Sequence, residues 1–137
     1  MTPASTRQQL LVLTYERDDE PNTTGGLRMS VTSGDFSAAA DAYVSEDQLL
    51  KFAAKLKAFP LEQAGAALDA GNITLTVTPI DPRGHLLVVA YLNSTWEPSS
   101  LTQEATLRFR TDYVPIDRFA RATFAMVQAG SGAAKLE

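Results

Sequence analysis

Hydrophobic and polar residues alternate with a period of two through much of the first part of the chain. Leu27, Met29 and Val31 alternate with polar neighbours, and the same period continues over residues 36–44 after Ser33-Gly34-Asp35. Alternation places every second side chain on one face of a strand, so these segments are predicted to be half-buried strands joined as a hairpin. Residues 10–15 are apolar at every position but Thr14, which indicates a strand covered at least partly on both faces.

The period changes from two to helical spacing at Ser45. Ser45 and Gln48 have the spacing of a capping box, which marks the start of a helix, and Pro60 is expected to stop it. Apolar residues recur on one face of this predicted helix, namely Leu49, Phe52, Ala53, Leu56 and Phe59.

The second part of the chain repeats this order of elements. Residues 61–71 read as a connector, with room for one helical turn, and residues 73–77 as a β-branched strand. Asp81-Pro82-Arg83-Gly84 has the composition of a type I turn, and residues 85–96 are apolar on both faces, which is typical of a central strand. After a turn at 97–100, residues 101–110 alternate again. A second helix is predicted from near Pro115, with a buried stripe of Ile116, Phe119, Ala120, Thr123, Phe124 and Val127.

These elements predict a single α+β domain over residues 1–129. Its mostly antiparallel sheet has about six strands and is covered by two amphipathic helices in the order βββα-βββα. Residues 43–47 align with residues 113–117, which makes a structural pseudo-repeat plausible. Residues 130–137 are expected to form a flexible tail, of which the last two could be a cloning remnant. Helices on one side would leave the other sheet face to water, a partner or a loop.

The composition excludes several classes of function but does not identify one. The chain has a formal net charge of −4 and no cysteine, which excludes disulfides, thiolate catalysis and metal sites built on sulfur. Mild acidity argues against nucleic-acid backbones as partners. No stretch resembles a signal peptide or is apolar for long enough to span a bilayer, so the expected setting is the cytoplasm, with no membrane partner.

The sequence offers little catalytic chemistry. His85 is the only histidine, and a general acid–base role would require a partner acid and a pocket. Asp18, Asp19 and Glu20 are consecutive, so their side chains should diverge in a solvated loop and not converge on a metal ion. Phosphate-binding loops and serine nucleophile motifs are absent from the sequence. We therefore expect no catalytic, cofactor-binding or metal-binding residues.

Two groups of residues are candidates for a protein interface. Tyr91, Trp96 and Tyr113 could form an exposed aromatic patch of the kind that anchors interfaces, with core packing as the alternative. The acids Asp18, Asp19 and Glu20 could present a negative surface to a partner.

From about residue 36 to residue 127 the chain resembles small bacterial proteins of the WapI-type immunity family. The resemblance rests on Tyr43-Val44-Ser45 leading into Asp47, Leu50 and Phe52, on Asp81 with Gly84-His85, and on Arg108-Phe109-Arg110-Thr111-Asp112 before the last helix. It implies an α+β domain that binds and blocks a cognate toxin without catalysis of its own.

Three functions therefore remain open from the sequence. The leading hypothesis is a non-catalytic protein-binding domain, such as an immunity-like inhibitor of a bacterial toxin. The second is a structural domain that forms a homodimer through an open sheet face. The third is an enzyme that uses His85 with Asp81 or Asp112.

Overall fold

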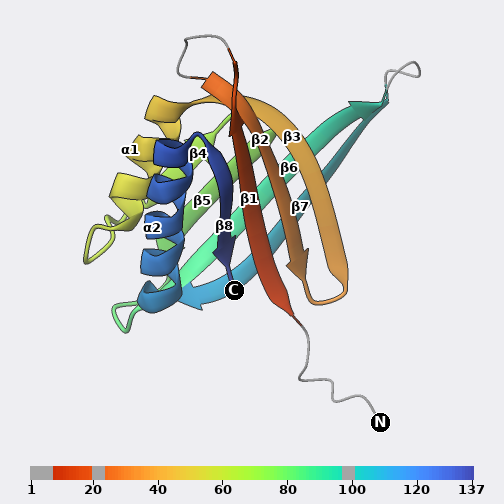
Figure 1. Cartoon of the computed structure of the whole chain (residues 1–137). Helices are drawn as coiled ribbons and strands as arrows, with labels where there is room; N and C mark the ends of the chain where they lie inside the picture. Colours follow the sequence, from red (N-terminus) through yellow and green to blue (C-terminus); the bar gives the residue numbers. More distant parts are fainter. Residues whose placement is uncertain (1–7, 20–23, 97–100) are drawn as a thin grey trace.

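The protein has the α+β fold class predicted from its sequence, with two helices and antiparallel strands. The computed structural model describes residues 8–19, 24–96 and 101–137, without the side chains of Thr95 and Trp96. The turn expected at 97–100 lies outside these residues. In chain order (Figure 1) the elements are β1 (Gln9–Arg17), β2 (Thr24–Ser33), β3 (Phe36–Ser45), α1 (Glu46–Leu56), β4 (Ala66–Asp69), β5 (Ile73–Pro79), β6 (His85–Trp96), β7 (Leu101–Asp112), α2 (Tyr113–Ala129) and β8 (Ser131–Leu136).

The strands form two sheets, which corrects the expected single sheet of about six strands. The first sheet has the order β3-β2-β1-β8 and the second the order β4-β5-β6-β7, with antiparallel pairing between neighbours. Helix α1 carries the chain from the first sheet to the second, and α2 carries it back. Alternation shows that one face of a strand is buried, but it does not show which element covers that face.

The strand predicted to be central, β6, is central, and β1, which is expected to be covered at least partly on both faces, is central as well. β1 lies between β2 and β8, and β6 lies between β5 and β7. On the outer faces, Val12 of β1 and Leu87 and Val89 of β6 are half-buried, whereas many of the alternating positions on neighbouring strands are polar. The outer face of β1 is only partly covered, since Thr14 on the same face as Val12 is exposed.

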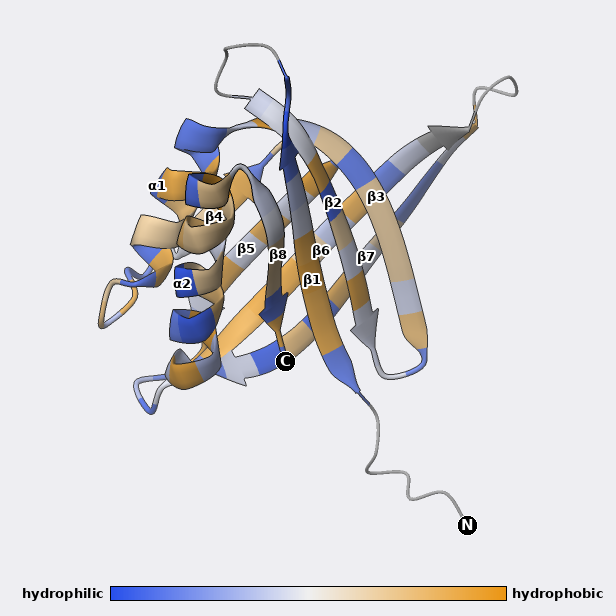
Figure 2. Cartoon of the chain, viewed as in Figure 1, coloured by the Kyte–Doolittle hydropathy of each residue, from blue (hydrophilic) through white to orange (hydrophobic). Residues whose placement is uncertain are grey.

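One hydrophobic core holds the two sheets and both helices together. The sheets face each other, and the helices lie side by side next to β8 (Figure 1), so they close one side of the space between the sheets instead of covering a single sheet. Figure 2 shows apolar segments in both sheets and on both helices. Fully buried side chains come from every layer, among them Leu13, Met29, Leu75, Val88 and Phe119. Neither helix in the described ranges is long and apolar enough to cross a membrane.

Helix α1 begins at the predicted capping box. The Ser45 hydroxyl accepts a hydrogen bond from the Gln48 backbone N–H at 3.1 Å, and the Gln48 side-chain oxygen accepts one from the Ser45 backbone N–H at 3.0 Å. The helix ends at Leu56, one turn earlier than the pattern predicts, and Pro60 follows the end of the helix. Phe59 is therefore outside the helix, and it is exposed, contrary to the expectation that it belongs to the buried stripe.

Helix α2 begins at Tyr113, two residues before Pro115. A proline is tolerated there because the first turn of a helix has no acceptors for its N–H groups. The helix ends at Gly130, whose φ of 79° lies in the left-handed region that favours glycine. The early start removes the predicted alignment of residues 43–47 with residues 113–117, since Tyr43 and Val44 end a strand whereas Tyr113 and Val114 begin a helix.

The expected flexible tail is instead strand β8, which is a correction to the predicted domain boundary. β8 pairs with β1, where Ala134 lies opposite Leu13 and Leu136 opposite Leu11. Ala134 and Leu136 are buried in the core between exposed neighbours. The four-residue strand β4 likewise replaces part of the expected connector and pairs with β5.

Candidate functional site

Three exposed apolar side chains lie around two hollows at one corner of the molecule. Phe59 follows α1, Ile80 begins the turn between β5 and β6, and Val114 lies in the first turn of α2; they are 79%, 47% and 62% exposed. Ile80 lines one hollow and Val114 a second, and Phe59 and Tyr113 line both. We call Phe59, Ile80, Tyr113 and Val114, together with the other residues that line the two hollows, the aromatic corner.

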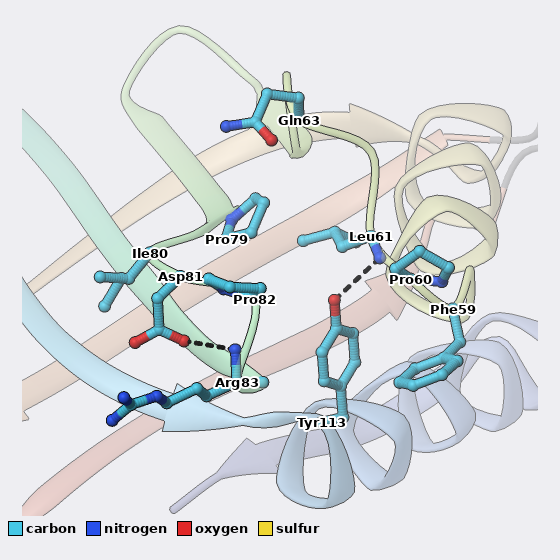
Figure 3. Close-up of a pocket in the computed structure, with 11 residues that line it drawn as sticks. Phe59, Pro60, Leu61, Gln63, Pro79, Ile80, Asp81, Pro82, Arg83 and Tyr113 are labelled. Atoms are coloured by element: carbon cyan, nitrogen blue, oxygen red, sulfur yellow. Dashed lines mark hydrogen bonds between the residues drawn. The ribbon is translucent and has the colours of Figure 1, made fainter.

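The centre of the aromatic corner is a contact between two rings. The Phe59 and Tyr113 ring centroids are 4.8 Å apart at an interplanar angle of 72°, which is an edge-to-face arrangement. The Tyr113 hydroxyl accepts a hydrogen bond from the backbone N–H of Leu61 at 2.9 Å. This bond ties the start of α2 to the connector after α1 (Figure 3), so the corner is held by contacts between segments that are distant in the sequence.

The two hollows adjoin at the ring pair, because Phe59 and Tyr113 line both of them. The first, of about 610 Å³, lies between the connector that carries Phe59 and Leu61 and the turn from Pro79 to Gly84. Figure 3 shows Tyr113 projecting between these two segments. The second hollow, of about 460 Å³, lies between the end of α1 and the first turns of α2. Together they form an apolar surface interrupted by a few polar groups, as is usual for binding sites.

The charged residues that line the hollows are mostly cations. The two linings contain four cationic side chains and two carboxylates, namely Lys57, Arg83, Arg118 and Arg121, and Asp81 and Asp117. Both carboxylates are already paired, because Asp117 accepts from Arg121 at 2.8 Å and Asp81 contacts the His85 ring at 2.8 Å. The bond from His85 holds the pKa of the Asp81 carboxyl below its usual value.

Some of the cations have no acidic partner. Within the part of the chain that the structure describes, the side chains of Arg83 and Arg118 make no ion pair or hydrogen bond. The Lys57 ammonium lies 5.5 Å from the centroid of the Phe124 ring, which is a cation–π contact. The aromatic corner is therefore locally positive on a chain whose net charge is −4.

The aromatic residues proposed as an interface do not form one patch. Tyr91 lies in the middle of β6, where its hydroxyl donates to the Glu104 carboxylate at 2.6 Å. This hydrogen bond raises the pKa of Tyr91. Tyr113 comes directly after Asp112, which pairs with His85 at the start of β6. Tyr91 lies further along β6, at a distance of roughly 20 Å from Tyr113 at the usual rise per strand residue. The side chain of Trp96 lies outside the described residues.

The proposed acidic surface is only partly described. Asp18 accepts hydrogen bonds from the hydroxyls of Tyr43 and Thr24, each at 3.4 Å, and Asp19 is exposed. Glu20 lies outside the described residues. Asp18 and the 70%-exposed Tyr43 together form a small polar and aromatic surface at one end of the first sheet.

His85 has the acid partner that a catalytic hypothesis requires, but it does not line either hollow. Its Nδ1 lies 2.8 Å from the Asp81 carboxylate, and its backbone lies opposite Asp112 across β6 and β7. Among the described residues, no group of three or more histidine, aspartate or glutamate side chains could hold a metal ion. The pair orients the turn that carries Ile80.

A partly exposed hydrogen-bond cluster on the first sheet is better explained by folding than by function. The Tyr15 hydroxyl donates to the Glu46 carboxylate at 2.8 Å, and Arg17 donates to Glu46 at 3.2 Å and to the Val127 carbonyl at 2.8 Å. Burial raises the pKa of Tyr15 to about 12, and the Arg17 guanidinium lowers the pKa of Glu46. The cluster joins β1 to the start of α1 and the end of α2.

A third hollow, of about 640 Å³, lies on the first sheet near Tyr43. The charges of Arg28 and Asp41, which both line it, are paired with each other at 2.9 Å. Its lining therefore offers fewer unsatisfied groups to a ligand than the aromatic corner does.

Comparison with known proteins identifies no relative: no family model, curated protein or solved structure matches this chain. The assignment of function therefore depends on the residues of the chain itself.

Proposed function

We propose that this chain is a protein-binding domain and that the aromatic corner is its contact surface. The observation that carries the proposal is the exposure of Phe59. A phenylalanine that is 79% exposed contributes little apolar burial to the fold, yet its ring packs against the ring of Tyr113. Ordered, exposed aromatic side chains beside hollows are typical anchors of protein interfaces.

The shape of the corner also supports a protein partner. Apolar side chains from three segments surround two hollows, and polar and charged groups lie at the edge. This arrangement matches the apolar centre and polar rim of protein interfaces. A toxin, as the resemblance to WapI-type immunity proteins implies, would be one partner of this kind.

The other two hypotheses have less support. The outer face of the second sheet carries Leu87 and Val89, but Thr76, Arg108 and Arg110 lie opposite them on the neighbouring strands. Such a mixed face suits a solvated sheet better than a dimer interface. The His85–Asp81 pair lies beside the hollows without lining them as a pair, so an enzyme reading has no defined substrate position.

Photo-cross-linking in the producing organism tests the proposal. A photoreactive phenylalanine analogue would replace Phe59 in one variant and Phe36 in another. Phe36 is the matched control, because it is also a phenylalanine and is 73% exposed, but it lies at the start of β3, away from the corner. We expect one discrete protein adduct from position 59 and none from position 36. No adduct from position 59, or the same adducts from both positions, would refute the proposal.

A further inference from the structure

The aromatic corner contains polar groups whose bonding capacity the described residues leave unused. The guanidinium groups of Arg83 and Arg118 lack acidic partners, although both carboxylates of the corner have cationic or histidine partners. Arg83 borders the first hollow and Arg118 the second, so each of the two hollows that adjoin at the Phe59–Tyr113 ring pair has one unpaired cation in its lining. If a neutral surface covered these guanidinium groups, they would lose their hydration without gaining a charged partner, which is unfavourable.

Tyr113, which lines both hollows, adds a hydroxyl donor. It accepts the Leu61 N–H, and its own hydrogen has no acceptor among the described residues. A backbone carbonyl of a bound segment could accept this hydrogen. An extended segment leaves its carbonyls free, whereas a helix has most of them bonded internally.

We infer that the occupant of the aromatic corner is an extended, acidic segment of a partner protein. An apolar side chain of this segment packs against the Phe59–Tyr113 ring pair, and carboxylates on either side of it pair with Arg83 and Arg118. The inference rests on the proposed protein-binding function and specifies the chemistry of the partner. Charge complementarity carries it, because the corner is positive although the whole chain is negative.

Arginine is well suited to this role on both sides of the ring pair. Its planar guanidinium binds a carboxylate through two parallel hydrogen bonds, which fixes the orientation of an acidic side chain as well as attracting it. The third free cation, Lys57, already lies over the Phe124 ring and is less available. Arg83 and Arg118 are therefore the residues that should select acidic side chains.

Selection from a random peptide library displayed on phage tests the inference with the intact purified chain. We expect the selected peptides to be enriched in aspartate and glutamate around an apolar position. Their binding should be lost in Phe59→Ala and retained in Phe36→Ala. In Arg83→Glu with Arg118→Glu, affinity for a selected acidic peptide should fall about fivefold to tenfold or more, since each exposed pair contributes modestly. Arg108→Glu, an exposed arginine on β7, is the matched charge control and should leave the affinity unchanged.

The outcomes separate the inference from the proposed function. Peptides that require Phe59 but show no acidic enrichment, and that bind the double charge-reversal variant equally well, would overturn the inference and leave the protein-binding function intact. Binding to a single-stranded oligothymidylate that is lost in Phe59→Ala would overturn it as well, because the partner would then be a nucleic acid. A dimer that Phe59→Ala dissociates would make a second copy the occupant and would also overturn it. If no selected peptide depends on Phe59, the proposed function itself fails.

Discussion

The replacement of Leu136 by alanine tests whether the last strand is part of the folded core. Leu136 is 1% exposed and lies opposite Leu11 in the pairing of β8 with β1. Removing a buried leucine side chain beyond Cβ costs both its transfer free energy and the cavity that remains, about 2–5 kcal/mol in protein cores. Because β8 is the last strand and can shift toward the cavity, we expect a loss of about 2–3 kcal/mol. Stabilities of single domains are about 5–15 kcal/mol, so this is a large effect.

Urea unfolding followed by circular dichroism measures this loss. We expect a lower midpoint in Leu136→Ala with an unchanged dependence on denaturant, which shows that stability has changed and compactness has not. Lys135→Ala is the control, because Lys135 is exposed on the same strand and its removal should change stability by no more than about 0.5 kcal/mol. Equal midpoints for Leu136→Ala and Lys135→Ala would refute the packing of β8, as would an unchanged midpoint after deletion of the strand.

Three further predictions concern the contacts around the helix ends. Ser45→Ala removes the N-cap of α1 and should lower the free energy of unfolding by about 1 kcal/mol in urea, whereas Ser30→Ala on the exposed face of β2 should not. The hydrogen bond from Arg17 lowers the pKa of Glu46 below 4.5, so charged Glu46 stabilises the fold above pH 4.5 and this stabilisation is lost as the pH falls through the lowered pKa. The difference in urea midpoint between wild type and Glu46→Gln should therefore shrink in acid, and a difference independent of pH would contradict this. Tyr15 has a pKa raised from 10.0 to about 12, so the folded state retains a proton that the unfolded state loses; stability should fall as the pH rises from 10 to 12, and this fall should be smaller in Tyr15→Phe.

The elements that sequence reasoning predicted correctly are those specified by local residues. The hairpin between β2 and β3 follows from alternation on both sides of Ser33-Gly34-Asp35, and the start of α1 from the Ser45–Gln48 box. Each signal acts over a few residues and needs no knowledge of the remaining chain. The central position of β6 also followed from its composition, because a run that is apolar on both faces is typical of a strand inside a sheet.

The two missed strands lack such local signals and exist through their pairing partners. β4 and β8 are rich in alanine, which has low strand propensity, and β8 begins with small residues. β4 follows Gly65, where φ is 79° and a side chain would meet the Val77 carbonyl at 2.2 Å. The glycine thus permits the close approach of β4 and β5, and only the folded structure shows that this approach occurs.

The pairing of β8 with β1 explains why the order of strands and helices suggests two similar halves, although the residues at the starts of α1 and α2 are not equivalent in the structure. If β8 is placed before β1, each sheet becomes four strands in consecutive order followed by one helix. The second half has this order directly, whereas the first half receives its edge strand from the far end of the chain. The two sheets share their strand order and pairing. This similarity does not require the residues at the starts of α1 and α2 to be similar.

The aromatic corner was missed because helical spacing continues past the end of the helix. Phe59 follows Leu56 by three residues and was therefore assigned to the buried stripe, but α1 ends at Leu56, and the chain then turns away before Pro60. A residue that close to a proline has little chance of remaining in a regular helix, and this was the signal available in the sequence.

Folding alone gives no reason for an aromatic ring at position 59, since a polar residue would be as well solvated there. The ring is nevertheless held against Tyr113, and Tyr113 is in turn held by the Leu61 N–H. Order without burial is what a preformed contact surface requires, because side chains that are already fixed lose less entropy when a partner binds.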